Sequence, residues 1–314
     1  MKLLLLLFGA LILFSCSKEQ QPAPKAAASS EQAPDTLYLE HNGSLYSVLS
    51  DGTGAKKIFT GYDAAVSNDH SLIAYTDYQN DKRFVAYYDS RTGYRHIYNN
   101  LTGDNAYGAQ LSPDNRTLLF NHFYNSQWVV ASVDTSGTGF TILTPPPSTA
   151  YGGYYQPRWF SDGTGFLCDN LDTVFEFSRD GKLLTAVATK SLVNIDSFGI
   201  SSSSLFWLDS KRNRYYFEGG SDIDEPPDFA PYAIFTHDKA LHKTIKLSPD
   251  TIHAMSPMWS ERTKLFYFRG YTKSEAAAIN PNDTAAFVTY SVFSVHEDGT
   301  GLKRLFSDSV LSEP

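Results

Sequence analysis

The chain has 314 residues, a formal charge of −8 at pH 7 and only two cysteines, Cys16 and Cys168. The chain has a net negative charge and no cluster of basic residues, which argues against nucleic acid as a partner. The 21 Phe, 20 Tyr and 21 Gly favour strands joined by tight turns, so composition predicts an all-β protein.

The N-terminus has the layout of an export signal. Lys2 precedes an apolar run at residues 3–14, and a run of about 12 residues is too short to cross a bilayer as a helix. Ser15 and Cys16 follow, and this order resembles a bacterial lipoprotein signal, in which the cysteine is lipidated and becomes the new N-terminus. We therefore expect a signal peptide at residues 1–15, a lipid anchor on Cys16 and a location in the bacterial cell envelope, on either side of the outer membrane. The alternative is a cleaved secretory signal with a chance cysteine.

Residues 16–36 are predicted to form a flexible tether. Residues 17–36 contain no aromatic side chain and almost nothing to bury, so they cannot offset the entropy of ordering. A loosely extended chain of about 20 residues reaches roughly 25 Å, which is enough to hold a folded domain off a lipid surface. If Cys16 carries lipid, Cys168 has no disulfide partner and the fold must depend on a hydrophobic core.

A repeated pattern begins at Leu37. Each copy has a first strand that ends in a polar turn, an apolar second strand, a third strand, and a glycine hairpin before a fourth strand. The hairpin glycines are separated by 41, 44 and 44 residues, at Gly52, Gly93, Gly137 and Gly181. Four strands in a period of roughly 40 to 45 residues predict the blade of a β-propeller.

The repeat count predicts six blades. The predicted first strands of five repeats contain Val66, Leu111, Trp159, Trp207 and Trp259. We expect residues 310–314 to supply the first strand of the sixth blade and residues 37–60 to supply its other three, because pairing the two ends in one sheet leaves no free ladder edge. The spacing lengthens later in the chain, which predicts insertions at residues 219–231 and 270–289.

The recurring motifs carry a family resemblance. Pro-x-Trp-Ser turns, as at Trp259, and Asp-Gly-Thr-Gly hairpins, as at residues 298–301, recur in register. They resemble the repeats of the TolB-type, WD-repeat-like six-bladed β-propellers of bacterial periplasmic proteins, over residues 37–314. The resemblance implies four-stranded blades and a binding role, and it names no partner. The repeat around Trp207 departs from the pattern because no proline precedes its tryptophan.

Catalytic motifs are absent from the sequence. There is no Gly-x-Ser-x-Gly elbow, His-Glu-x-x-His pair or phosphate-binding glycine loop. We therefore expect no enzymatic activity, no cofactor and no metal. His237 and His242 are interpreted as a solvated pair in preference to a metal site, and Cys168, in an apolar strand, as a small core residue.

One face of the predicted ring is rich in tyrosine. In a propeller, the loops between blades and the loops between second and third strands open on the same face, and two inter-blade loops contain several tyrosines. Exposed tyrosines near the axis suit stacking on a sugar or a peptide. The predicted ligand residues are Tyr107, Tyr151, Tyr154, Tyr155 and Arg158. The alternative is that the tyrosines pack over neighbouring blades.

The two insertions are predicted to lie on the same face. Residues 219–231 form an acidic loop that we interpret as solvated, with calcium or a basic partner as alternatives; the alanine-rich stretch in residues 270–289 could form a short helix or a lid. The sequence favours a monomeric, non-catalytic envelope lipoprotein that binds a protein, peptide or glycan. The alternatives are a structural component of an envelope complex and a polysaccharide-active enzyme that uses Asp222 and Asp224.

Overall fold

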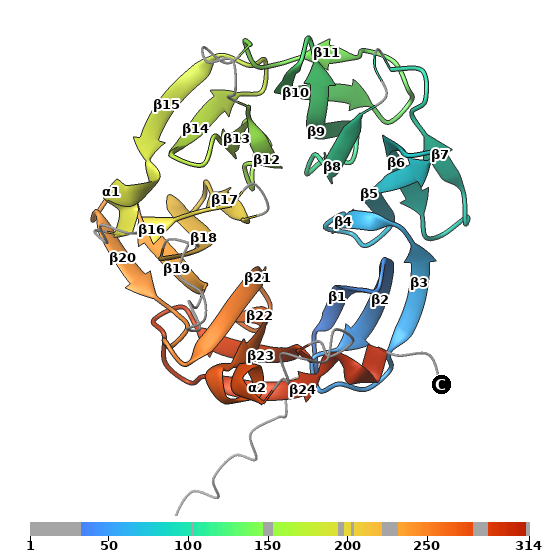
Figure 1. Cartoon of the computed structure of the whole chain (residues 1–314). Coiled ribbons are helices and arrows are strands. Elements are labelled where there is room, and N and C mark those ends of the chain that lie inside the picture. The colour runs from blue at the N-terminus through green and yellow to red at the C-terminus, as the bar shows by residue number, and fades with distance from the viewer. Residues whose placement is uncertain are drawn as a thin grey trace, which may run out of the picture. The chain divides into compact units, whose positions relative to one another are not determined.

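The computed structural model describes residues 33–101, 103, 105–146, 153–193, 198–201, 204–221, 232–278 and 288–311. Six antiparallel sheets are arranged as blades around a central axis (Figure 1). The predicted all-β six-bladed propeller is therefore confirmed.

The blades follow one another in chain order. Blade 1 contains β1–β3 (Thr36–His41, Ser44–Leu49, Lys56–Thr60), blade 2 contains β4–β7 (Tyr62–Val66, Leu72–Gln79, Lys82–Asp89, Arg95–Ile97), and blade 3 contains β8–β11 (Ala106–Leu111, Thr117–Tyr124, Gln127–Asp134, Thr141–Ile142). Blade 4 contains β12–β15 (Tyr155–Trp159, Gly165–Asp169, Thr173–Ser178, Leu183–Ala188), blade 5 contains β16–β20 (Phe198–Gly199, Phe206–Asp209, Arg214–Ser221, Ala233–Asp238, Lys243–Lys246), and blade 6 contains β21–β24 (Ile252–Ser260, Leu265–Thr272, Ser291–His296, Lys303–Ser307). Short helices occur at α1 (Thr189–Val193), α2 (Lys273–Ala277) and the 3₁₀ helix η1 (Asp308–Leu311).

The hairpins explain the spacing of the glycines. The four glycines whose spacing predicted the repeat are Gly52, Gly93, Gly137 and Gly181. All adopt φ between 74° and 86°, in the left-handed region that side chains disfavour. Two-residue turns join second and third strands elsewhere, as at Asn80 and Asp81, where both φ values are positive. Such turns match the twist of the flanking strands, which fixes the register of the hairpin.

The hydrophobic core lies between the blades. Ala74 and Val85 of blade 2 pack with Leu118 and Phe120 of blade 3 in one buried cluster, and the other clusters join neighbouring blades in the same way. Each sheet therefore buries both of its faces against the adjacent sheets, as a radial arrangement of blades requires.

The closure of the ring differs from the prediction. Blade 1 is a three-stranded sheet in the order β1-β2-β3, and Val310 and Leu311 belong to η1 instead of a strand, while residues 312–314 lie outside the described part. Asp308 at the start of η1 accepts a hydrogen bond from Arg269 at 2.8 Å, and Leu311 is buried against Leu37. The segment that ends at Leu311 thus meets blade 1 through the packing of Leu311 on Leu37, and the Asp308–Arg269 pair ties η1 to blade 6; among the described residues no further strand completes blade 1.

The insertions occur where the repeat spacing placed them. One separates β18 from β19 and the other separates β22 from β23, so both connect a second strand to a third. The expected short helix is α2, whose capping box pairs Thr272 with Glu275. Residues 222–231 and 279–287 lie outside the described part, so the proposed acidic carboxylates Asp222 and Asp224 are not placed.

Four innermost strands share a bulge. The left-handed residue in each bulge is Asp63, Gly108, Gln156 or Ser256, with φ between 46° and 67°. A bulge leaves backbone N–H groups without a ladder partner. In these four blades, a backbone N–H group of the bulge donates a hydrogen bond to a polar side chain of the preceding blade.

The acceptors for these bulges occupy one repeat position, the fifth residue of the second strand, which in the three-stranded blade 1 corresponds to β1. Glu40 accepts from the N–H of Ala64, Thr76 from Gly108 at 3.0 Å, Asn121 from Gln156 at 3.1 Å, and Glu218 from Ser256. Asp169 and Arg269 hold the same position in β13 and β22, and Arg269 donates to the carbonyl of Glu40 at 2.9 Å. We call these six residues the latch ring.

Candidate functional site

Aromatic side chains of blades 2 and 3 cluster on the face of the ring that carries the loops between blades. We call it the inter-blade face. Three of them are unusually exposed for their size: Tyr78 by 52%, Tyr62 by 46% and Phe123 by 40%. We define the aromatic patch as Tyr62, Tyr78, Arg83, Tyr107, Phe123 and Trp128. An exposed aromatic group of this kind is typical of a binding surface.

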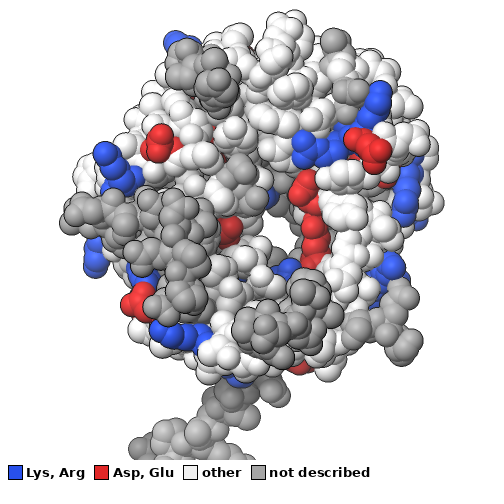
Figure 2. Space-filling model, viewed as in Figure 1, with Lys and Arg blue, Asp and Glu red and all other residues white. Residues whose placement is uncertain are grey.

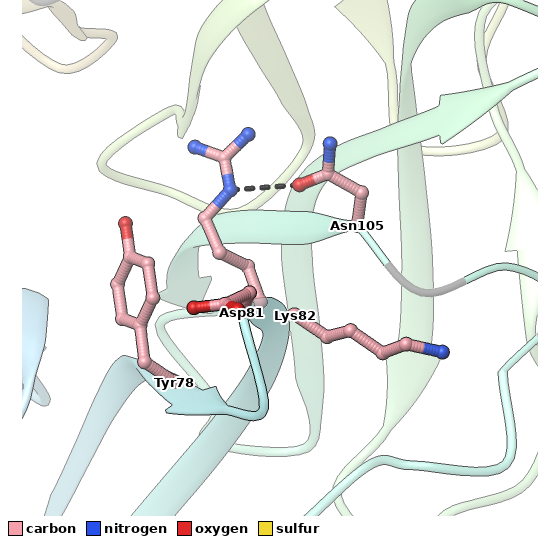
Figure 3. A pocket seen from close by; sticks show the side chains of 5 residues that line it. Tyr78, Asp81, Lys82 and Asn105 are labelled. Atoms are coloured by element: carbon pink, nitrogen blue, oxygen red, sulfur yellow. Dashed lines mark hydrogen bonds between the residues drawn. The ribbon is translucent and has the colours of Figure 1, made fainter.

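Arg83 organises the patch. Its Nε donates to Oδ1 of Asn105 at 2.7 Å (Figure 3), and its guanidinium carbon lies 4.5 Å from the ring centroid of Tyr107 and 5.3 Å from that of Trp128. Trp128 in turn meets Tyr107 edge-on, with the ring centroids 5.0 Å apart. The cation and the two rings hold one another in place, so little side-chain entropy remains to be lost on binding.

A hollow of about 400 Å³ opens beside this arrangement, lined by Tyr78, Asp81, Lys82, Arg83 and Asn105 (Figure 3). The β5–β6 hairpin supplies four of these residues and a short parallel bridge between Arg83 and Asn105 joins the fifth to it. Tyr78 forms an edge-to-face pair with Tyr62, with centroids 4.9 Å apart. The hollow therefore combines apolar ring surface with charges of both signs.

Tyr107 is the predicted ligand residue that the structure places in this patch. It lies in β8 instead of the preceding loop and is half-buried. Burial raises the pKa of its hydroxyl to about 12, although the nearby charge of Arg83 opposes this shift. The hydroxyl is thus neutral at physiological pH and can donate or accept a hydrogen bond.

The other predicted tyrosines have different positions. Tyr154 is buried, with its ring edge-on to Phe175 and Phe177, so the packing alternative holds for it. Tyr155 is half-buried in β12, and Tyr151 lies outside the described residues. Gly153 is required between them, because a Cβ there would lie 2.9 Å from Trp128 and from the hydroxyl of Tyr155.

Arg158 does not join this face. It lies further along β12, in the central channel, where its Nη1 donates to Oε1 of Gln110 at 2.7 Å. Burial lowers the pKa of its guanidinium to about 10, and the carboxylates of Glu218, Asp63 and Glu40 oppose that shift. Figure 2 shows acidic side chains on the wall of the central opening.

Two carboxyl groups of the latch ring titrate near neutrality. Burial raises the pKa of Glu218 to about 7, against the opposing effects of the N–H groups of Ser256 and Leu205 and the charge of Arg158. Burial also raises the pKa of Asp169 to about 7. Because Glu218 accepts from both of those backbone groups, its environment is accounted for by its place in the latch ring.

The remaining predicted features have simple surroundings. Cys168 is fully buried, and burial raises the pKa of its thiol. His237 is buried and hydrogen-bonds Thr244 at 2.9 Å, so it is not half of a solvated pair. Over the described ranges, no three His, Cys, Asp or Glu side chains converge as a metal site would require.

The predictions for the N-terminus lie outside the described part of the chain. Cys16 belongs to residues 1–32, which the structure does not describe. From residue 33 onward, no described helix has the length and apolar character needed to cross a membrane.

Sequence reasoning missed Tyr78, Arg83 and Trp128. A signal for the first two was present, because Asn80-Asp81 between two strand-like runs marks a two-residue hairpin whose flanking residues face the same side as the inter-blade loops. The latch ring also had a signal, since a polar residue ends the apolar run of every second strand. Neither signal contains a glycine, so the glycine spacing does not report it.

The fold has counterparts among solved structures. TolB from Acinetobacter baumannii is similar with a TM-score of 0.58 and 15% identity, over 84% of this chain and 59% of that one. A prolyl endopeptidase matches with a TM-score of 0.50 and 13% identity, over 87% of this chain and 42% of that one. An oligogalacturonate lyase in complex with manganese matches with a TM-score of 0.51 and 10% identity, over 88% of this chain and 73% of that one.

These similarities concern the fold alone. No family model and no curated protein sequence matches the chain. This chain spans about three fifths of the TolB structure and about two fifths of the endopeptidase, and its structural neighbours include both enzymes and non-enzymes. The chain is thus a six-bladed β-propeller structurally similar to the TolB propeller at low sequence identity.

Proposed function

We propose that this protein is a non-catalytic binding module of the bacterial envelope and that its inter-blade face binds a peptide segment of a protein partner. The observation that carries the proposal is the aromatic patch, in which Arg83 holds Tyr107 and Trp128 beside the exposed ring of Tyr78. Tyrosine, tryptophan and arginine are the residues that most often dominate binding energy at protein interfaces.

The charges around the patch support a peptide partner. Asp81 and Lys82 lie at the turn next to Tyr78 and line the same hollow, so the rim offers both an acceptor and a donor for a polar backbone. A peptide presents both kinds of group at every residue. A glycan bound to the same rings is the second outcome that the test below distinguishes.

A non-catalytic role agrees with the chemistry of the channel. A glycosidase would need two carboxyl groups about 5 to 9.5 Å apart, one of them with a raised pKa and both facing substrate. Glu218 has the raised pKa, but its two oxygens are engaged by backbone N–H groups. Its protonation therefore serves the fold.

The anchor is part of the same proposal. A lipid on Cys16 and a tether of about 20 residues would keep the propeller at a membrane surface while leaving it free to turn. Cys16→Ser should release an intact propeller into the water-soluble fraction after cell lysis. Retention of the variant in the membrane fraction would contradict the lipid anchor without bearing on the aromatic patch.

The binding test compares variants of one surface. The full-length protein, Tyr78→Ala, Arg83→Ala and the control Leu184→Ala would be used to capture partners from solubilised envelopes, with quantitative mass spectrometry as the readout. Leu184 is 55% exposed on the outermost strand of blade 4, so its truncation removes exposed apolar surface elsewhere. We expect the two patch variants to lose at least one partner that the control retains, with unchanged melting temperatures.

Protease treatment of the extract separates the two partner classes. Loss of the captured material after proteolysis supports a peptide partner, and its survival would replace the peptide with a glycan. Equal capture by the wild type and both patch variants would refute a binding role for this face.

A further inference from the structure

A second pocket opens at the other end of the central channel. It has a volume of about 390 Å³, within the usual range of small-ligand sites. The ends of innermost strands from five blades line it, with Trp159, Trp207 and Trp259 from three consecutive blades as its largest side chains. Tyr107 and Tyr155 lie near the opposite ends of these strands, so this pocket is separate from the aromatic patch.

The tryptophan rings are held by neighbouring side chains. The guanidinium carbon of Arg179 lies 5.3 Å from the ring centroid of Trp159, and that of Arg212 lies 4.6 Å from Trp259. Trp207 meets the ring of Tyr216 edge-on at 5.2 Å. Each aromatic wall is thus fixed before any ligand arrives, which lowers the entropy cost of binding.

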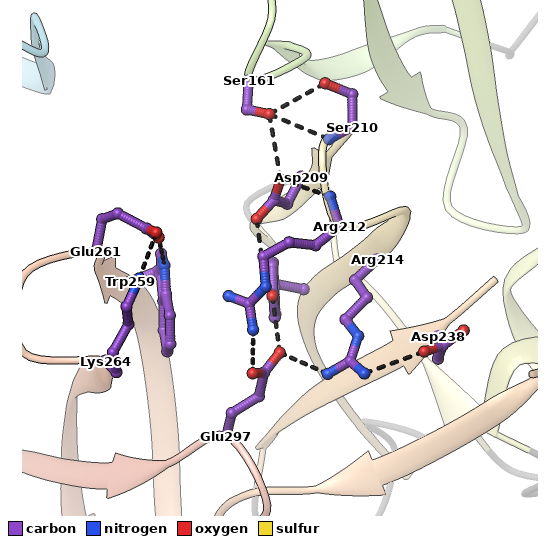
Figure 4. A network of polar contacts seen from close by, with 11 residues as sticks. Ser161, Asp209, Ser210, Arg212, Arg214, Asp238, Trp259, Glu261, Lys264 and Glu297 are labelled. Atoms are coloured by element: carbon purple, nitrogen blue, oxygen red, sulfur yellow. Dashed lines mark hydrogen bonds and ion pairs between the residues drawn. The ribbon is translucent and has the colours of Figure 1, made fainter. Parts of the chain in front are cut away.

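A polar network fixes these supports in turn. Glu297 accepts from Arg212, from Arg214 at 2.7 Å and from the hydroxyl of Tyr216 at 2.9 Å (Figure 4). Arg214 also pairs with Asp238 at 3.0 Å. Two arginines and a tyrosine from blade 5 therefore share one carboxylate from blade 6, and the wall between these blades is rigid.

The floor of the pocket offers hydrogen-bond donors. Arg158 and Gln110 both line it, and their mutual bond of 2.7 Å uses the amide oxygen of Gln110. The amide nitrogen of Gln110 and the remaining N–H groups of Arg158 donate to no acceptor among the described residues. A ligand in this pocket would therefore meet flat apolar walls and a floor that donates.

The charges narrow the class of ligand. A cationic group would face Arg158 at the floor and meet the positive charges of Arg179 and Arg212 next to the rings. An anionic group would face Asp209, which lines the pocket, and the negative charges of Asp63 and Glu40 that act on Arg158. A neutral ligand with an apolar face and hydroxyl acceptors fits both constraints.

We propose that this pocket binds a neutral sugar residue, whose C–H face packs on the tryptophan rings and whose hydroxyl oxygens accept from Arg158 and Gln110. A pyranose ring presents these two kinds of surface on adjacent sides. The site is independent of the peptide partner proposed for the aromatic patch, because no residue is shared.

Tryptophan fluorescence provides a direct test. The chain has four tryptophans, three of which line the pocket, so full-length Trp128→Phe protein emits only from the pocket. Maltose, cellobiose and N,N′-diacetylchitobiose would be titrated to millimolar concentrations, with digalacturonate as an anionic comparison. We expect a saturable change with at least one neutral sugar and a much weaker one with digalacturonate.

Two variants locate the binding. Gln110→Ala removes a floor donor without altering the walls, and Trp159→Ala removes one wall; each should weaken binding by at least about tenfold, as the loss of one good contact does. The melting temperature of each variant shows that it is folded. The Tyr78→Ala variant should bind the sugar as the wild type does.

Three results would overturn the proposal. They are no saturable change with any neutral sugar, binding that Gln110→Ala leaves intact, and a response to digalacturonate at least as strong as that to the neutral sugars. Because the aromatic patch is silent in this measurement, none of these results bears on the partner of the inter-blade face.

Discussion

Asp35 holds the N-terminal strand to blade 6, and removing its carboxylate should weaken the ring at this junction. The carboxylate accepts from Nε of Arg262 at 2.7 Å, from the hydroxyl of Thr263 at 2.7 Å and from the hydroxyl of Tyr267 at 2.8 Å. Asp35 and Tyr267 are both buried. Asp35→Ala therefore removes an acceptor that a buried phenol, a hydroxyl and a nearby arginine share.

The expected loss can be worked from these contacts. A hydrogen bond to a charged group contributes about 1.5 to 3 kcal/mol, and the one from Arg262 counts for less because that side chain is partly exposed. We therefore expect Asp35→Ala to lower the free energy of unfolding by about 3 to 4 kcal/mol, and Asp35→Asn, which keeps one acceptor oxygen, by about half of that. For a domain of this size the melting temperature should fall by roughly 6 to 12 °C.

The pH dependence supplies a second measurement. Burial alone would raise the pKa of Asp35, but hydrogen bonds from Thr263, Ser260, Tyr267 and Arg262 together lower it. A lowered folded pKa means that the stabilisation is present above the ordinary value and is lost as the pH falls toward the folded value. The difference in unfolding free energy between the wild type and Asp35→Ala should thus become smaller below about pH 4.

Urea unfolding of the full-length protein would measure both effects. Asp51→Ala is the matched control, because this exposed aspartate caps only its own hairpin through Thr53, and we expect it to change stability far less. If Asp35→Ala and Asp51→Ala lowered the unfolding free energy equally, the contact between the N-terminal strand and blade 6 would not depend on the buried carboxylate.

Two further predictions concern the same ring. Deleting residues 308–314 removes Leu311 from its cluster and Asp308 from Arg269, so the melting temperature should fall far more than after deletion of residues 17–33; similar shifts would show that η1 does not help to close the ring. Glu218 keeps its proton up to a pKa of about 7 in the folded state, so wild-type stability should decline as the pH rises from about 4.5 to 7. Glu218→Gln, which mimics the protonated form, should flatten that decline and exceed the wild type at pH 8 by up to about 3 kcal/mol; an unchanged slope of unfolding free energy against pH would contradict a buried neutral carboxyl.

Much of the fold could be predicted because a propeller repeats its local signals. Val66, Leu111, Trp159, Trp207 and Trp259 all lie in innermost strands, as expected. The regular spacing of the glycine hairpins made these strand assignments possible, because each hairpin needs a residue with positive φ at one position.

The closing segment could not be predicted in the same way. A run such as residues 310–314 is too short for periodicity to separate a strand from a 3₁₀ turn. Asp308 at the start of this segment pairs with Arg269, 39 residues earlier in the chain, and no local signal in the sequence reports such a contact.

The candidate site was predicted in part for a related reason. Inter-blade loops with several tyrosines pointed to the face that carries the aromatic patch, and Tyr107 belongs to that patch. Whether a tyrosine is exposed depends on what packs against it, and the two phenylalanines of β14 that cover Tyr154 are about 20 residues away in the sequence. Arg158 was assigned to the wrong end of the channel because a bulge shifts the side chains that follow it.

The latch ring has a consequence for how the propeller unfolds. Repeat proteins whose neighbours touch only through apolar surface can lose terminal repeats one at a time. Here a second strand supplies the acceptor for the backbone of the next innermost strand in four of the described junctions. Opening one blade would expose unpaired groups in its neighbour, so amide hydrogen exchange in the strands nearest the axis should proceed through global unfolding with a single free energy.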